Sequence, residues 1–300
     1  MNPGYLYAAA AFLLWGVLPT YWKQLDAIPT SQLVAHRVVW SIAILMPLVA
    51  LTGAGGSICT AFMNPGLLAR QGLAAIFVSA NWLGFVWAVT HGRMIESSLG
   101  YFLNPLLSVL VGVVVLGERL RPMQWIAIVI AALGVTWLAA QYHHFPWIAL
   151  FLAGTFCLYS LAKKQTSLGA VPSLTVETLL LVVPASLFLI GEHVAGRGSF
   201  GRFGWRDDLL IAFSGVVTVV PLLCFAAAAR RIPLSAIGLM QYLGPSLQFL
   251  LGVFVYAEPF DAADLMGFAI VWTALLLYVI DDLRRLTLAR PVDIAADSVH

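Results

Sequence analysis

The sequence predicts an all-α integral membrane protein with ten transmembrane helices in two inverted five-helix repeats. Three observations support this fold class: a strongly apolar composition, apolar segments long enough to cross a bilayer, and a second half that echoes the first. Of the 300 residues, 61% are apolar and 10% are charged, whereas about 25% of the residues of a soluble domain are charged. With a mean hydropathy of +0.92, most of the surface is expected to face lipid. The net charge of +2 is too small to indicate nucleic-acid binding.

Ten apolar segments are each close to the ~20 residues that a helix needs to cross the hydrocarbon core. The expected spans are residues 4–22, 30–52, 71–90, 95–116, 123–140, 146–163, 172–191, 208–229, 233–256 and 263–281. Two boundaries are weakly marked. No charge lies between Val38 and Ala69, so the second span is expected to end at the Gly-rich turn 53–56, and only residues 141–146 separate the fifth and sixth spans. Nine spans therefore stay open as an alternative to ten.

The distribution of Lys and Arg predicts the orientation, because cytoplasmic loops are enriched in both residues. With the N-terminus inside, ten of them fall in cytoplasmic segments and five in outer segments, while Arg37 lies within a span. The cytoplasmic set is Arg70, Arg119, Arg121, Lys163, Lys164, Arg230, Arg231, Arg284, Arg285 and Arg290; the outer set is Lys23, Arg93, Arg197, Arg202 and Arg206. Both termini, including a polar tail at 283–300 that is expected to be disordered, are therefore predicted to face the cytoplasm.

The two halves of the chain match when the sequence is shifted by 140 residues. Matched Pro, Gly and Glu are rarer by chance in an apolar chain than matched Leu and Val. The pairs are Pro105 with Pro245, Gly112 with Gly252 and Glu118 with Glu258. The predicted units are residues 1–141 and 142–282. Because five spans are an odd number, the second unit must enter the membrane from the opposite side, which is the inverted-repeat architecture of many secondary transporters.

Several motifs resemble the RarD branch of the EamA family, within the drug/metabolite transporter superfamily. They are Asn81-Trp82, the run 97–106 (SSLGYFLNPL), Gly117-Glu118-Arg119-Leu120, the run 177–180 (ETLL), the run 241–245 (QYLGP) and the run 36–41 (HRVVWS). The resemblance covers residues 3–285. It implies two five-helix units, a bacterial inner-membrane location, cytoplasmic termini, and export or exchange of small organic solutes. The RarD name further implies a chloramphenicol-resistance permease, although no residue pattern identifies chloramphenicol.

A polar stripe in span 95–116 predicts a solute cavity near the middle of the bilayer. Ser97, Tyr101, Asn104 and Ser108 share one helix face. Pro105 cannot donate to the carbonyl of Tyr101, and in span 233–256 Pro245 is expected to free the carbonyl of Gln241 in the same way. Carbonyls freed at this depth must find partners or line a wet cavity. Packing kinks satisfied by neighbouring helices are the alternative to a cavity near Pro105 and Pro245.

His36 and Arg37 lie roughly two turns inside span 30–52. A charge at membrane depth is costly and indicates a functional site. Arg37 is expected to clamp a carboxylate or phosphate through its planar fork, to pair with an acidic residue, or to extend its long side chain to the headgroups. His36 is predicted to be a hydrogen-bonded packing residue as well as a gating candidate.

Glu177 lies one to two turns inside span 172–191, near the repeat counterpart of His36 and Arg37. A buried carboxylate could bind a coupling proton or cation. The structural alternative is an acid that is satisfied by loop donors or by Lys163 and Lys164. Glu118 and Glu258, where spans 95–116 and 233–256 end, are expected mainly to make helix-end and interhelix contacts.

Aromatic and amide side chains away from the span ends are the remaining candidates for the solute site. Together with the polar stripe they give the predicted substrate-binding set, which is Trp15, Asn81, Trp82, Tyr101, Asn104, Tyr159, Gln241 and Tyr242. Such a lining suits a small amphipathic molecule with an apolar or aromatic body and a few polar groups. Plain packing is the alternative for the aromatic members.

These features predict a secondary transporter that moves a small amphipathic organic solute by alternating access. A metabolite facilitator or channel-like uniporter without ion coupling is the alternative, although no ring of charges or carbonyl filter occurs in the sequence. An enzyme is not expected, because no nucleophile–base pair or paired acid occurs. No cofactor or metal is expected either, since the three Cys are far apart and form no CxxC motif. The predicted partners are the solute and the bilayer, and the oligomeric state, a monomer included, stays open.

Overall fold

The computed structural model describes residues 2–90, 94–140, 145–255 and 262–288. These residues form twelve α-helices and one 3-10 helix, and no strand occurs among them, so the all-α class is confirmed. The elements are α1 (Pro3–Trp22), η1 (Lys23–Leu25), α2 (Thr30–Thr52), α3 (Gly55–Met63), α4 (Pro65–Thr90), α5 (Met94–Val114), α6 (Pro122–Ala139), α7 (Trp147–Gln165), α8 (Ala170–Val194), α9 (Trp205–Ala229), α10 (Leu234–Met240), α11 (Leu243–Phe254) and α12 (Ala262–Leu288). Each predicted span coincides with one of these helices or, for 233–256, with two.

Four helices, α2, α6, α8 and α9, are long and apolar enough to cross a membrane on length and composition alone, among the residues that the structure describes. Two shorter apolar stretches lie at Leu99–Val114 and Leu265–Asp281. Large apolar side chains such as Leu51, Met63, Val194 and Phe254 are exposed on the outside of the bundle. A surface of this kind is expected where lipid replaces water.

The predicted span 233–256 is not one helix. It is divided into α10 and α11 at Gln241 and Tyr242, and the carbonyl of Gln241, which was expected to be free, accepts a hydrogen bond from the backbone N–H of Gly244 at 3.2 Å. Pro245 lies in the first turn of α11, where no intrahelical donor is required. Pro105 lies inside the continuous helix α5. The two matched prolines therefore act differently, and the prediction of two equivalent kinks is wrong.

Helix boundaries depart from the predictions at two further places. Gly53 adopts a left-handed φ of 63° and ends α2, as expected for the Gly-rich turn. The segment after it, predicted to be a loop up to residue 70, forms α3 and the first turn of α4. The last helix continues to Leu288, beyond the predicted end at residue 281, so the first part of the predicted tail is helical. Glu258 and residues 289–300 lie outside the described part of the chain.

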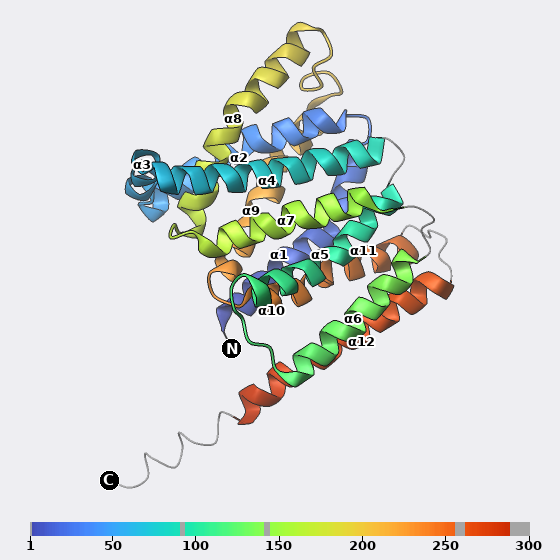
Figure 1. The fold of residues 1–300 in the computed structure, drawn as a ribbon. Coiled ribbons are helices and arrows are strands. Elements are labelled where there is room, and N and C mark those ends of the chain that lie inside the picture. The colour runs from blue at the N-terminus through green and yellow to red at the C-terminus, as the bar shows by residue number, and fades with distance from the viewer. Residues whose placement is uncertain (1, 91–93, 141–144, 256–261, 289–300) are drawn as a thin grey trace.

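Helix packing brings the two halves of the chain together repeatedly. α1 packs on α9 and α11, α2 on α8 and α9, α4 on α7 and α8, and α5 on α7 and α10. α6 and α12 lie side by side at the edge of the bundle, and the beginning of α1 and the end of α12 are at the same end of the molecule (Figure 1). By their order in the two halves, α1 corresponds to α7, α4 to α9 and α5 to α11. The α1–α9 contact is therefore the counterpart of the α4–α7 contact, and the α5–α7 contact is the counterpart of the α1–α11 contact.

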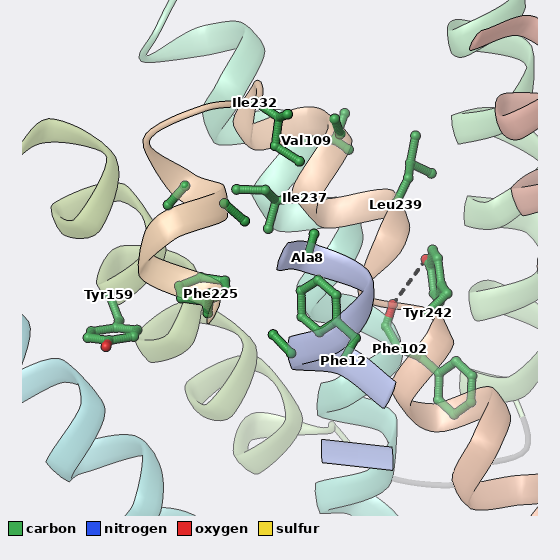
Figure 2. Packing of buried hydrophobic residues seen from close by; sticks show 14 of the residues in the cluster. Ala8, Phe12, Phe102, Val109, Tyr159, Phe225, Ile232, Ile237, Leu239 and Tyr242 are labelled. Atoms are coloured by element: carbon green, nitrogen blue, oxygen red, sulfur yellow. Dashed lines mark hydrogen bonds between the residues drawn. The ribbon is translucent and has the colours of Figure 1, made fainter. Parts of the chain in front are cut away.

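The largest buried cluster lies where α1, α5, α7, α9 and α10 meet. Phe12 packs edge-on against Phe225, which stacks on the ring of Tyr159 at an interplanar angle of 14° (Figure 2). Tyr242, fully buried, donates from its hydroxyl to the carbonyl of Phe102. Because Phe12 and Phe102 come from the first half and Tyr159, Phe225 and Tyr242 from the second, these contacts join the two halves.

Glu118 joins the two halves at the end of α5. Its carboxylate accepts hydrogen bonds from the backbone N–H of Leu234 at 2.7 Å, and from the N–H and hydroxyl of Ser235 at 2.9 and 2.6 Å. These are the unsatisfied donors of the first turn of α10, and a carboxylate there also interacts favourably with the helix dipole. The expectation of a helix-end and interhelix contact at Glu118 is therefore confirmed.

Candidate functional site

A small cavity lies among α2, α4, α7, α8 and α9. It is lined by Val38, Ser41, Val78, Trp82, Tyr159, Leu174, Glu177, Thr178, Leu181, Thr218, Val219 and Leu222. Its volume is about 20 Å³, which is room for roughly one water molecule. None of the lining residues comes from α5, α10 or α11, so this cavity is displaced from the position that was predicted near Pro105 and Pro245. Two clusters of polar residues border it, one around Arg37 and one around Glu177, and we call them its two polar ends.

The first polar end is formed around Arg37, in the second turn of α2. Arg37 donates from Nε to the hydroxyl of Thr218 at 2.9 Å. Its guanidinium carbon lies 4.5 Å from the ring centre of Trp82 and 5.0 Å from that of Trp22. Trp82 and Thr218 are both cavity-lining residues, so Arg37 stands directly behind the wall. Cation–π contacts of this kind hold a guanidinium away from water.

The contacts of Arg37 with the described residues are all with uncharged groups. No carboxylate of the described residues forms an ion pair with Arg37. The guanidinium is held by rings of α1 and α4 and by a hydroxyl of α9. The side chain of Arg37 is partly exposed. The clamp for an anionic group, the pairing with an acid and the extension to the headgroups all stay predictions.

His36 packs beside this end without joining it. It is buried, and its ring centre lies 5.8 Å from that of Phe200, which also packs at 5.8 Å against Trp40. The segment that carries Phe200 is held by Gln32, whose side chain donates to the carbonyl of Arg197 at 2.8 Å and accepts from the N–H of Ser199 at 2.9 Å. We call residues 197–200 the strap, because they cover one face of the first turns of α2.

The strap has its own ion pair at the end of α8. Arg197 and Glu192 are joined by two hydrogen bonds of 3.1 and 2.7 Å. The hydrogen bond from Arg197 holds the pKa of the Glu192 carboxyl below its usual value. Glu192 also accepts from Gln32. The polar anchors of the strap are thus separate from Arg37.

The second polar end contains a buried ion pair. Lys163 Nζ lies 2.5 Å from Glu177 Oε1, and the two side chains are 1% and 2% exposed. The ammonium also donates to the hydroxyl of Ser173 at 3.0 Å, and that hydroxyl is 2.9 Å from the amide oxygen of Gln71. Gln71 in turn donates to Thr166. Oε1 of Glu177 is therefore paired with Lys163, one of the two lysines that the structural alternative named.

Lys163, which was predicted to lie in a cytoplasmic segment, is buried in the structure. Lys163 lies in the last turn of α7 and points into the bundle, four residues after Tyr159, whose ring centre is 5.4 Å from Nζ. Lys164 points elsewhere and donates to the carbonyls of Ala229 and Ile232, at the end of α9. The i, i+4 spacing of Tyr159 and Lys163 is the sequence signal that could have identified this residue.

Two atoms at this end of the cavity have no hydrogen-bond partner among the described residues. They are Oε2 of Glu177 and the hydroxyl of Tyr159, which lies close to the same carboxylate. Both residues line the cavity. Buried polar atoms are nearly always paired, so unpaired ones that border a cavity indicate a place where a ligand or water binds.

The predicted substrate-binding residues divide into two groups. Trp82 and Tyr159 line the cavity, and Tyr101 lies near Arg37. Asn81 is turned away, because its amide donates to the carbonyl of Leu152 and to Thr155 of α7. Trp15 packs in an aromatic cluster with Phe12, Phe156 and Phe225.

Tyr242, Asn104 and Gln241 lie away from the cavity lining. Tyr242 is committed to the carbonyl of Phe102. Asn104 and Gln241 are buried, and each has a side-chain oxygen without a hydrogen-bond partner among the described residues. The side chain of Ser97 lies outside the described part. Of the eight predicted substrate-binding residues the cavity lining thus includes two, Trp82 and Tyr159, and it adds Ser41, Thr178 and Thr218, which sequence reasoning missed.

Comparisons with known proteins agree with the fold. The profile of the EamA-like transporter family matches residues 2–140. The chain is 39% identical to Protein RarD of Salmonella typhimurium, over 93% of this chain and 95% of that protein. It is 34% identical to the chloramphenicol-sensitive protein RarD of Pseudomonas aeruginosa, over 94% and 95%. A solved crystal structure of a protein with 21% identity has the same fold, with a TM-score of 0.72 over 96% of this chain and 99% of that one.

These matches define a membrane transporter class. The chain belongs to the EamA-like transporter family and, within it, is similar to the RarD proteins over nearly its whole length. It is therefore an integral membrane protein, and the resemblance drawn from its motifs is confirmed.

Proposed function

We propose that this protein is a secondary transporter that moves a small amphipathic organic solute across the bacterial inner membrane by alternating access. Ten crossings in two inverted units, residues 1–141 and 142–282, with both termini in the cytoplasm, complete the proposal. The symmetric packing of helix pairs and the position of the chain ends at one end of the bundle support this layout (Figure 1).

The observation that carries the proposal is the cavity. Its walls come from α2 and α4 of the first half and from α7, α8 and α9 of the second half. At about 20 Å³ it holds about one water molecule, so a solute enters only if the halves move apart. A closed cavity between two repeats is what alternating access requires in an occluded state, whereas a channel needs a continuous pore.

The lining supports an amphipathic cargo. Leu, Val and Trp side chains supply apolar contact, and polar atoms at the two ends supply orientation. Chloramphenicol, which appears in the name of the Pseudomonas aeruginosa relative, has an aromatic ring and polar groups and is a suitable first probe of transport. Glu177 as a coupling site stays a prediction, and any such role must involve Lys163.

Exchange in proteoliposomes tests the proposal. Purified protein is reconstituted, loaded with unlabelled solute, and assayed for uptake of the labelled form. A carrier gives saturable uptake that unlabelled solute on the opposite side accelerates, and product analysis should recover the solute unchanged. Uptake that neither saturates nor responds to solute on the opposite side would support the channel-like alternative and contradict alternating access.

A further inference from the structure

The charges around the cavity do not balance. Lys163 and Glu177 form a buried pair and neutralise each other. Arg37 is held by a hydroxyl and two aromatic rings, none of which carries a full negative charge. Asp208, a carboxylate near His36, accepts from the backbone N–H of Gly201 at 2.7 Å and forms no ion pair with Arg37. Among the described residues, the site therefore carries one uncompensated positive charge.

The geometry of Arg37 leaves its most useful donors available. Nε is occupied by Thr218, while the described residues provide no hydrogen-bond acceptor for the two terminal amines. Trp22 and Trp82 flank the guanidinium and restrict its orientation. A guanidinium with both terminal amines available binds a carboxylate through two parallel hydrogen bonds. Arg37 is only partly exposed, and a charge with less access to water attracts an opposite charge more strongly.

We propose that the transported solute is an organic monoanion whose carboxylate binds to Arg37. This inference rests on the proposed transport function and specifies its substrate class. The apolar or aromatic body of the solute packs between Trp82 and the Leu and Val side chains of the cavity wall. A hydrogen-bond donor on the far end of the solute reaches Oε2 of Glu177, which has no partner among the described residues.

The charge of the site distinguishes organic monoanions from uncharged solutes and from solutes with two negative charges. A carboxylate brings the cavity to neutrality. An uncharged solute leaves the buried cation unpaired, and a phosphate monoester with nearly two negative charges leaves an excess of the opposite sign. Uncompensated charge at membrane depth is costly in either case. The selectivity is therefore expected to depend on the charge of the head group more than on the size of the body.

Matched pairs of ligands test the inference on the purified full-length protein. The probes are 3-phenylpropanoate, 4-hydroxyphenylacetate and indole-3-acetate, each compared with its primary amide in a thermal-stabilisation titration. The amide keeps the shape and loses the charge. We expect the carboxylates to reach half-saturation at concentrations at least about tenfold lower than the amides, since hydrogen bonds between charged groups are worth about 1.5–3 kcal/mol.

Two variants assign the preference to Arg37. Arg37→Gln should remove the preference for the carboxylate, and Arg37→Lys should weaken it because the fork is lost while the charge is kept. Arg202→Gln removes one positive charge from an exposed position and should leave the preference intact. The ligand-free melting temperature of each variant shows whether it is folded.

The outcomes separate the two proposals. Equal binding of amides and carboxylates, a preference that survives Arg37→Gln, or no stabilisation by any carboxylate would overturn the monoanion. Exchange of chloramphenicol without any preference for carboxylates would also overturn it, while leaving the transporter standing. Conversely, carboxylates could bind in a way that depends on Arg37 while solute on the opposite side fails to accelerate uptake. That result would support the preference for a monoanion and count against the carrier mechanism.

Discussion

The two polar ends of the cavity place a cation inside the bundle in opposite ways. At the Glu177 end, Lys163 is paired with a carboxylate at 2.5 Å and bonded to a hydroxyl. At the Arg37 end, the cation has two indole rings and one hydroxyl but no acid among the described residues. In the first arrangement the two charges balance without a ligand. In the second, no charge among the described residues balances the cation, and the proposed solute would supply one.

Because of this difference, we expect one cation to contribute to the stability of the fold and the other to solute binding. Removing one partner of a complete buried pair leaves the other charge exposed to a low-dielectric interior, and the folded state loses stability. Removing an uncompensated cation takes away a charge that the fold already holds at a cost. Lys163 is therefore expected to be a stabilising residue, and Arg37 a residue retained for binding.

The largest expected effect follows from breaking the pair. Lys163→Met keeps most of the side-chain length and leaves Glu177 buried without its cation, so we expect a loss of about 3–5 kcal/mol in the free energy of unfolding. Denaturant unfolding in detergent measures this loss. Lys164→Met is the control, because the neighbouring ammonium only caps the carbonyls of Ala229 and Ile232 and its removal should cost about 1 kcal/mol.

A second substitution sharpens the same test. In Lys163→Met/Glu177→Leu both charges are replaced by apolar groups, and much of the lost stability should return, since apolar replacements of buried pairs are often neutral. A single Lys163→Met variant as stable as the parent would show that the pair is not the source of stability at this end.

The Arg37 end depends instead on close packing of α2 against α9. A Cβ at Gly215 would lie 2.5 Å from the carbonyl oxygen of Trp40, a backbone atom that cannot move alone. Gly215→Ala should therefore separate the helices, displace Thr218 from Arg37, and cost about 1–3 kcal/mol. Melting temperature and carboxylate affinity measure the two effects.

Gly154→Ala in α7 is the matched control for this helix contact. A Cβ there meets nothing within 4 Å, so the change should leave affinity unaltered and stabilise the helix by up to about 1 kcal/mol. Equal behaviour of Gly215→Ala and Gly154→Ala would contradict the close approach of α2 and α9.

Most of the helices could be predicted from the sequence, because hydrophobic length is a local property. The second span was predicted to end at the Gly-rich turn, and Gly53 ends α2 there with its left-handed φ. The break at Gln241 could not be located from Pro245 alone. A proline can kink a helix from within or begin a new one, and the choice depends on which partners the neighbouring backbone finds in three dimensions.

The site was predicted less well than the fold, for a physical reason. The sequence shows which residues are polar and at what depth, but not which neighbour each one contacts. Asn81 and Tyr242 have the same polar-in-apolar signature as Tyr159, yet both are satisfied by backbone carbonyls. Lys163 was named only as an alternative partner of Glu177 and not as a site residue, because a lysine near a helix end is expected to reach water.

The smallest expected effect on stability is at Arg37 itself, and its size shows whether the two ends of the cavity differ. Arg37→Gln removes the charge and two cation–π contacts, while the amide can still donate to Thr218. The loss of contacts and the relief of an uncompensated buried charge oppose each other, so we expect the free energy of unfolding to change by less than about 1 kcal/mol. The same denaturant titration that is used for Lys163→Met measures it. A loss of 3 kcal/mol or more would mean that Arg37 has a charged partner in the folded state, and the two ends of the cavity would then be alike. A small change combined with lost carboxylate selectivity would establish that one buried cation stabilises the fold while the other is kept for the solute.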